Sequence, residues 1–240
     1  MTHADAPFPP KREQKQKQPK GSRKALPLWA ETILLLVTAL VLAIVVKSFF
    51  IQAFYIPSPS MVPALVKNDR ILVEKMSYWG GGTPQRGDIV VFKDPGHWLS
   101  AEESSPPTNG FTKLLTDIGL YPSGGHLVKR VIGVGGDRVI CCDKQGHITV
   151  NGTALHEKSY LPQGTKPSLT RFDIRVPQGD LWVMGDNRGD SWDSRGHMGD
   201  PGGGYVPADL VVGKVFALVW PFSRAELIHR PSTFQDIPNP

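Results

Sequence analysis

Two serines stand two positions apart in the stretch IPSPSMVPAL, which spans residues 56–65. Three prolines share this stretch, and proline both fixes φ and disfavours a helical conformation for the residue before it. We therefore expect an extended chain in which Ser58 and Ser60 present their hydroxyls to the same side. A serine hydroxyl becomes a nucleophile when a nearby base removes its proton. Taken alone, the stretch is equally compatible with a proline-rich linker.

One candidate base for such a serine is Lys129, in the segment HLVKRVIGV. Alternate residues of a strand share a face, so Leu127, Lys129 and Val131 should lie together. Apolar neighbours disfavour the charged ammonium and favour a neutral amine, which can accept a proton. The alternative interpretation is an ordinary lysine on an edge strand, with its amine in water.

Histidine is the more usual partner of a nucleophilic serine, so a Ser-His-Asp triad is a second possibility. The chain has seven histidines, most of them in segments typical of loops and turns, but no G-x-S-x-G motif. These histidines are His3, His97, His126, His147, His156, His197 and His229. Nothing in their sequence context gives the triad positive support.

A third polar cluster, GDNRGDSWDSR, spans residues 185–195. It is rich in loop-forming residues, and Arg188 and Arg195 can pair with its carboxylates. One interpretation is a salt-bridged turn. The other is a support for the lysine, in which Ser191 holds the amine while Asp193 and Arg195 fix the loop.

An apolar segment, residues 28–51, precedes these motifs and can cross a bilayer as a helix of ~20 residues. The chain's excess of basic residues, 27 Lys and Arg against 22 Asp and Glu, lies entirely in residues 1–28. The charge therefore gives no support to nucleic-acid binding by the folded part. Residues 1–27 are expected to form a disordered cytoplasmic tail, because basic residues remain on the cytoplasmic side. The chain is thus predicted to cross the plasma membrane once, with everything after residue 51 outside the cytoplasm.

A cleaved signal peptide would share the basic start and the apolar run. Cleavage needs small residues at −3 and −1 soon after that run, whereas large apolar and aromatic residues follow it here and no Ala-x-Ala stands downstream of it. We therefore favour an uncleaved anchor.

Beyond residue 56, short segments rich in Val and Ile are bounded by Gly, Pro, Asp and Asn, which is typical of antiparallel strands. The expected strands are DRILVEKM, GDIVVFK, HLVKRVIGV, DRVICC, HITVNG, FDIRVP, DLWVMGD and LVVGKVFALVW. The pattern predicts a mainly β domain over residues 52–240, with a surface insertion at about 94–126 and another near 196–205. A weak helical pattern lies at 111–120.

The only two cysteines, Cys141 and Cys142, are adjacent. A disulfide between neighbours needs an unusual peptide geometry, so two free thiols or an intermolecular disulfide are expected instead. Neither CxxC nor HxxxH occurs, and the acidic loop misses the spacing of a calcium site, so no metal site is predicted.

In their order along the chain, PSPSMVPAL, GDIVVF, VKRVIGVGGD and GDNRGDSWDSR closely resemble the conserved boxes of bacterial type I signal peptidases, or leader peptidases. Each box alone is a weak signal, but four boxes in this order behind an N-terminal anchor are specific. The resemblance covers the anchor and essentially all of the part that follows it. It implies a mainly β fold, an antiparallel catalytic core with a small inserted β subdomain.

The resemblance further implies that Ser60 is the nucleophile and Lys129 the general base. The oxyanion hole would consist of the Ser58 hydroxyl and the backbone N–H of Ser60. Many family members have Gly or an acidic residue between the two serines, whereas this chain has Pro59. Because proline has no N–H, any mechanism that uses the N–H of residue 59 is excluded here.

The same resemblance implies that Ser191 orients Lys129, with Asp193, Arg195 and Arg130 in support. The implied activity is the removal of signal peptides from exported preproteins after small residues at −3 and −1, without a cofactor. The implied partners are preproteins and the lipid bilayer, with the secretion translocon as a further candidate.

Two other function classes are open from the sequence. A self-cleaving Ser–Lys repressor protease would share the chemistry, but it needs a DNA-binding domain and a scissile linker that the N-terminal region lacks. A membrane-anchored β domain without catalytic activity would serve as an envelope scaffold, and it would fail to cut a preprotein peptide.

Overall fold

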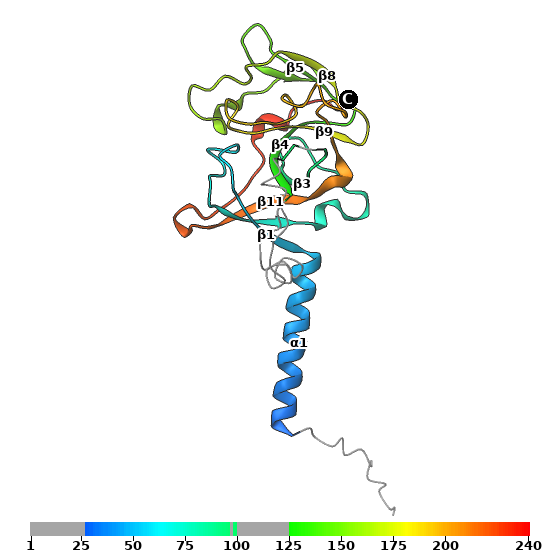
Figure 1. The fold of residues 1–240 in the computed structure, drawn as a ribbon, viewed down its shortest axis with the longest axis vertical. Coiled ribbons are helices and arrows are strands. Elements are labelled where there is room, and N and C mark those ends of the chain that lie inside the picture. The colour runs from blue at the N-terminus through cyan, green and yellow to red at the C-terminus, as the bar shows by residue number, and fades with distance from the viewer. Residues whose placement is uncertain (1–26, 97, 100–124) are drawn as a thin grey trace, which may run out of the picture. The chain divides into compact units, whose positions relative to one another are not determined.

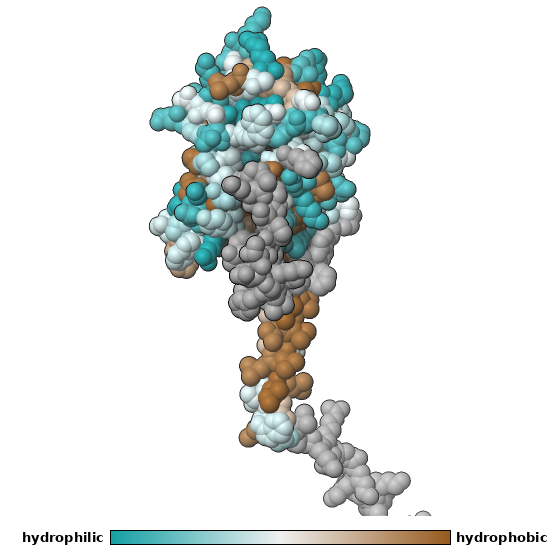
Figure 2. All heavy atoms as spheres, in the orientation of Figure 1, coloured by the Kyte–Doolittle hydropathy of each residue, from teal (hydrophilic) through white to brown (hydrophobic). Residues whose placement is uncertain are grey.

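The computed structural model describes residues 27–96, 98–99 and 125–240. Its first element, α1 (Leu28–Phe49), is apolar on all sides, and Figure 2 shows it as a brown surface. The apolar part, Leu28–Val46, has 19 residues, which at ~1.5 Å per residue nearly spans a hydrocarbon core of ~30 Å. Within it, the hydroxyl of Thr38 donates to Leu34 O at 2.7 Å, so this polar group is satisfied inside the helix. The helix is therefore consistent with a membrane anchor.

The end of α1 differs from the prediction of an apolar span to residue 51. The helix ends at Phe49, and β1 (Ile51–Tyr55) begins almost at once. β1 pairs antiparallel with β2 (Arg70–Glu74), and Lys75 N–H donates to Phe50 O at 3.1 Å. Sequence analysis missed β1 because the apolar composition continues from helix to strand without a break.

The larger sheet has eight strands in the order β1-β2-β11-β3-β4-β9-β10, with β12 paired to β11. All of its pairings are antiparallel. The remaining bounds are β3 (Ile89–Lys93), β4 (His126–Val134), β9 (Asp180–Met184), β10 (Val206–Pro207), β11 (Val211–Trp220) and β12 (Glu226–Leu227).

A second, four-stranded sheet is inserted in the chain between β4 and β9, in the order β7-β6-β5-β8. Its strands are β5 (Arg138–Cys141), β6 (Ile148–Val150), β7 (Thr153–Ala154) and β8 (Phe172–Arg175). Figure 1 shows β5 and β8 at one end of the domain, beyond β4 and β9. The mainly antiparallel β fold with a small inserted β subdomain is confirmed.

Both faces of the larger sheet are covered at its centre. On β3, Ile89 and Val91 pack into one buried cluster, whereas Val90 and Phe92 pack into another on the opposite face. A strand buried on both faces needs apolar residues at every position, which is why IVVF shows no polar alternation. β4 is its neighbour and is therefore an interior strand, not an edge.

All eight expected strand segments contain a strand. The strands that sequence analysis missed, apart from β1, are β7, β10 and β12, and each has only two residues, too few to show a pattern. The insertion near 196–205 consists largely of turns. Most of the insertion 94–126, including the helical pattern at 111–120, lies outside the described residues.

The expectation for the two cysteines was wrong. Cys141 and Cys142, at the end of β5, form a disulfide with each other, and the peptide bond between them is cis. Their Cα atoms are 3.0 Å apart, close enough for the two sulfur atoms to bond within one dipeptide.

Candidate active site

The serine stretch leaves β1 and bends instead of staying extended. Pro59 O accepts the N–H of Val62 at 3.1 Å, and Met61 O accepts that of Leu65 at 3.0 Å. The predicted extended conformation was therefore wrong from Ser58 on. Proline is compatible with turns, because its carbonyl can still accept the hydrogen bond that closes one. The predicted side-by-side hydroxyls are confirmed, since Ser58 Oγ lies 3.2 Å from Ser60 Oγ.

The amine of Lys129 reaches this turn from β4. Its Nζ lies at hydrogen-bond distance, 2.7 Å, from Ser60 Oγ, and the residues are only 5% and 8% exposed. Leu127 and Val131 belong to one buried cluster, and Val90 of β3 lies opposite Lys129 in the register. The lysine thus sits among apolar side chains of an interior strand, and the edge-strand interpretation is excluded.

No described histidine hydrogen-bonds to Ser60. Within the described part of the chain, Ser60 Oγ contacts Lys129 and Ser58, while its backbone N–H has no intramolecular acceptor. His197 does form a histidine–carboxylate pair, with Nδ1 2.6 Å from Asp200, but its ring stacks on Trp98 instead of meeting a serine. The geometry therefore favours the lysine over a Ser-His-Asp triad.

A groove of about 370 Å³ opens beside the two serines and Lys129. Aromatic and aliphatic side chains form much of its wall, among them Phe54, Ile56, Met61, Trp98, Leu127 and Trp192. An apolar groove beside a nucleophile can hold an extended peptide and exclude water from the reacting bond.

The predicted support loop is folded around a buried carboxylate. Asp193 is fully buried and accepts from Arg195 Nε at 2.9 Å and Nη2 at 2.7 Å. It also accepts from Ser191 Oγ at 2.8 Å and from Gly185 N–H at 2.9 Å. Burial alone would raise the pKa of Asp193, but the hydrogen bonds and charge of Arg195 outweigh it and lower that pKa below its ordinary value. Asp193 therefore stays ionised and closes the loop, whereas the orientation of Lys129 by Ser191 stays a prediction.

The 185–195 loop touches the backbone of Ser60. Asn187 N–H donates to Ser60 O at 3.0 Å, and the Asn187 side chain donates to Pro59 O at 3.2 Å. Gly185 makes this approach possible, because a Cβ there would lie 2.2 Å from Ser191 Oγ and 2.4 Å from Ser60 O. Sequence analysis treated Asn187 only as a loop former, since a backbone contact across 127 positions leaves no local signal.

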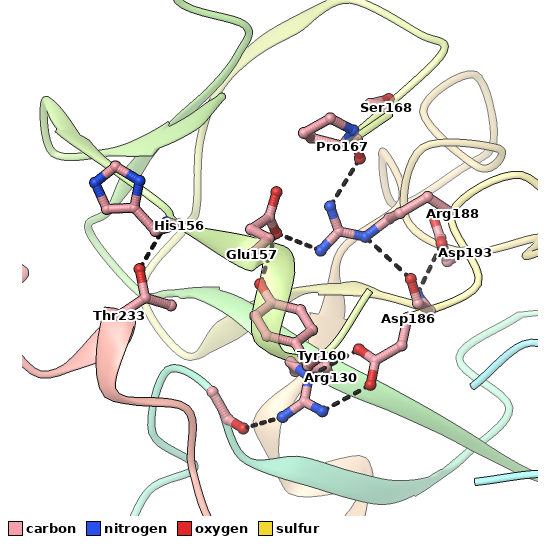
Figure 3. Close-up of polar contacts among 12 residues, drawn as sticks. Arg130, His156, Glu157, Tyr160, Pro167, Ser168, Asp186, Arg188, Asp193 and Thr233 are labelled. Atoms are coloured by element: carbon pink, nitrogen blue, oxygen red, sulfur yellow. Dashed lines mark hydrogen bonds and ion pairs between the residues drawn. The ribbon is translucent and has the colours of Figure 1, made fainter. Parts of the chain in front are cut away.

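Arg130, next to the lysine, points to the other face of β4. It is 2% exposed and binds both carboxylate oxygens of Asp186, at 2.8 and 2.6 Å, and Gly87 O at 2.9 Å (Figure 3). This bidentate pair joins β4 to the start of the loop, whereas the support of Lys129 by Arg130 stays a prediction. The sequence motifs do not single out Asp186. Its place in GDNR, a loop whose carboxylates are expected to pair with arginines, is a usable signal.

The chain is similar to known proteins over most of its length. Residues 29–220 match a family model described as "Signal peptidase, peptidase S26". A signal peptidase I of Mycobacterium tuberculosis is 41% identical over 218 residues, covering 81% of this chain and 73% of that protein. A probable signal peptidase I of Mycobacterium leprae is 38% identical over 232 residues, covering 84% and 79% respectively. A probable signal peptidase I-2 of Synechocystis is 36% identical over 200 residues, covering 83% and 77%.

The crowding at Gly185 gives a first prediction. Gly185→Ala should lower the rate of peptide hydrolysis by about 10²-fold, because its methyl group must displace Ser60 O or Ser191, and shifts near 1 Å at a reacting group cost that much. Gly189→Ala in the same loop is the matched control, since a Cβ there meets nothing within 4 Å. Equal rates in the two variants would contradict this close-approach argument.

Proposed function

We propose a serine–lysine mechanism for this chain, which belongs to the signal peptidase family, peptidase S26. The chain is a signal peptidase I and removes signal peptides from preproteins. The observation that carries the mechanism is the 2.7 Å contact between Lys129 Nζ and Ser60 Oγ in a buried, apolar setting.

In the proposed acylation step, neutral Lys129 takes the proton of Ser60 as Oγ attacks the scissile carbonyl carbon. The resulting ammonium gives that proton to the departing amine, which leaves an ester between Ser60 and the signal peptide. In deacylation, Lys129 takes a proton from water as the water oxygen attacks the ester carbonyl carbon. The bond between that carbon and Ser60 Oγ then breaks, the Lys129 ammonium returns the proton to Ser60 Oγ, and the signal peptide leaves with a free carboxyl terminus. One amine thus serves as base and acid in both steps, and no cofactor is required.

The developing oxyanion needs donors beside Ser60. The backbone N–H of Ser60 has no intramolecular acceptor within the described residues, and the Ser58 hydroxyl lies 3.2 Å from Ser60 Oγ. We assign these two groups as the oxyanion hole, while Pro59 between them contributes no donor. Donors aimed at charge that exists only in the transition state raise kcat more than they change KM.

The groove supports the proposed substrate class. Its largely apolar wall runs past Ser58, Ser60 and Lys129, so an extended peptide could lie in it with the scissile bond at the nucleophile. We propose that the residues before the cut are small, as in an Ala-x-Ala sequence, and enter it as an extended strand.

Replacement of either member of the pair should abolish activity while the fold survives. Ser60→Ala, Lys129→Ala and Lys129→Arg in the full-length chain should each lower kcat on a preprotein peptide by more than about a thousandfold. The two groups act as one unit, and a guanidinium stays protonated and cannot serve as the base. Steady-state kinetics in detergent measure kcat for each variant, and circular dichroism checks that each variant is folded.

Two further variants complete that series. Lys144→Ala removes an exposed lysine and should leave kcat unchanged. Ser58→Ala should show an intermediate loss in kcat of about 10² to 10³ with KM nearly unchanged, as expected for one oxyanion donor. If Ser60→Ala retained more than about a thousandth of the wild-type rate, that result would contradict the proposed Ser60–Lys129 mechanism.

We also propose that α1 places the catalytic domain outside the cytoplasm. The basic residues precede α1, and the positive-inside rule keeps such residues in the cytoplasm. The domain would then meet preproteins on the side of the membrane where they emerge.

Labelling with a membrane-impermeant maleimide tests this orientation. Gln163→Cys, at an exposed position of the catalytic domain, should be labelled in intact spheroplasts, whereas Ser22→Cys in the tail should be labelled only after permeabilisation. Labelling of Ser22→Cys in intact spheroplasts would overturn the charge argument, and the unsubstituted chain reports any background from Cys141 and Cys142.

A further inference from the structure

Two buried arginines lie behind the catalytic pair, and both meet the same short segment of the inserted subdomain. This segment is the 3-10 turn Glu157–Ser159 and the Tyr160 that follows it, between β7 and β8. Figure 3 shows Glu157 and Tyr160 facing Arg130 and Arg188. Neither Glu157 nor Tyr160 belongs to the sequence motifs that carry the proposed chemistry.

The contact with Arg188 is an ion pair buried away from the protein surface. Arg188 Nη2 donates to Glu157 Oε1 at 2.5 Å, and the side chains are 1% and 2% exposed. The other groups of Arg188 hold two loops, because Nε donates to Gly185 O at 3.1 Å and Nη1 to Pro167 O at 2.7 Å. Glu157 thus fixes the arginine that fixes Gly185, where an added Cβ would lie 2.4 Å from Ser60 O.

The contact with Arg130 is through the ring of Tyr160. The guanidinium carbon of Arg130 lies 4.5 Å from the ring centroid, while the Tyr160 hydroxyl donates to Glu157 Oε1 at 2.6 Å. Burial, and then the charge of Glu157, raise the pKa of Tyr160 well above its ordinary value, so the phenol stays neutral and keeps this bond. One carboxylate oxygen therefore organises supports for both strand β4 and the 185–195 loop.

The segment itself is anchored on its far side. His156 N–H donates to Thr233 Oγ1 at 2.8 Å, and the Tyr160 ring lies 6.0 Å from that of Phe234. Leu155 and Leu161, on either side of the turn, are buried in the core of the inserted subdomain. Because its segment is anchored in this way, the Glu157 carboxylate can restrict the positions of Arg130 and Arg188.

We propose that Glu157, assisted by Tyr160, is a positioning residue for the catalytic pair, which it holds in register through Arg188 and Arg130. The inserted subdomain then contributes to catalysis, because two of its residues help to place the catalytic pair. This inference rests on the proposed Ser60–Lys129 mechanism, and Glu157 itself touches neither substrate nor a reacting atom.

The test compares Glu157→Gln with a buried ion pair whose side chains form no hydrogen bond or ion pair, among the described residues, with Arg130, Arg188 or the proposed catalytic pair. Asp137 is fully buried and binds Arg86 at 2.7 and 2.6 Å, as well as Val134 N–H, so Asp137→Asn is the matched control. Both full-length variants are assayed in detergent well below their unfolding midpoints. Glu157→Gln should lower kcat by about 10- to 100-fold with KM within about twofold, because a small displacement of reacting groups has effects of this size. Asp137→Asn should lose thermal stability but keep kcat within about twofold.

Milder variants keep the test decisive if Glu157→Gln does not fold. Glu157→Asp retains the charge at a shorter reach, and Tyr160→Phe retains the ring over Arg130 but removes the hydroxyl. Each should lower kcat without changing KM, and less than Glu157→Gln would. A folded Glu157 variant with wild-type kcat would overturn the positioning role. The role would also be overturned if kcat fell in proportion to the unfolding midpoint, both in the Glu157 and Tyr160 variants and in the control Asp137→Asn.

Ser60→Ala, assayed beside them, separates the two claims. An active Ser60→Ala overturns the dyad and the positioning role with it. An inactive Ser60→Ala together with an unaffected Glu157 series overturns the positioning role alone.

Discussion

The structure depends on one short contact, the 2.7 Å between the amine of Lys129 and the hydroxyl of Ser60. A lysine is costly to bury, and its amine is useful as a base only when burial favours the neutral form. β4 is an interior strand flanked by β3 and β9, and apolar residues of the same face surround the lysine, which is the setting that the proposed mechanism requires. The turn that follows β1 then brings the serine to the amine, so in the proposed mechanism the sheet supplies the base and the turn supplies the nucleophile.

A second constraint lies on the other face of the same strand. Buried guanidinium groups must be paired, because an uncompensated buried charge destabilises a fold by about 3–5 kcal/mol. Here Asp186 pairs with Arg130, Glu157 pairs with Arg188, and Asp193 pairs with Arg195. Each of these pairs also binds backbone. Arg130 donates to Gly87 O, Arg188 donates to Gly185 O, and Asp193 accepts from Gly185 N–H. The bonds that neutralise buried charge are therefore the same bonds that we propose place Ser60 and Lys129.

The sequence was informative where a local pattern carries the physics, and less so where distant segments meet. Repeated Val and Ile between turn residues predicted the β domain, and strand alternation correctly predicted apolar neighbours for Lys129. The contact of Asn187 with the backbone of Ser60 could not be predicted, since it depends on how two loops meet in space. Glu157 was equally hidden, because an isolated glutamate in a polar linker looks like any surface residue.

Local geometry misled the sequence analysis where two conformations suit the same residues. Three prolines predict an extended chain, yet the residues from Ser58 on form a turn closed by the carbonyl of Pro59. Adjacent cysteines predict two free thiols or an intermolecular disulfide, yet Cys141 and Cys142 are bonded to each other. The end of α1 was placed too late because composition does not distinguish apolar helix from apolar strand.

The most direct test of the central claim is to follow the protonation of Lys129 itself. In full-length protein with labelled lysine side chains, the ¹³Cε chemical shift of Lys129, assigned by comparison with Lys129→Arg, is measured against pH alongside kcat/KM. The serine–lysine account predicts that the amine loses its proton over the same pH range in which kcat/KM rises. An amine that remains protonated throughout that rise would contradict it, because the proposed base could not then accept the proton of Ser60.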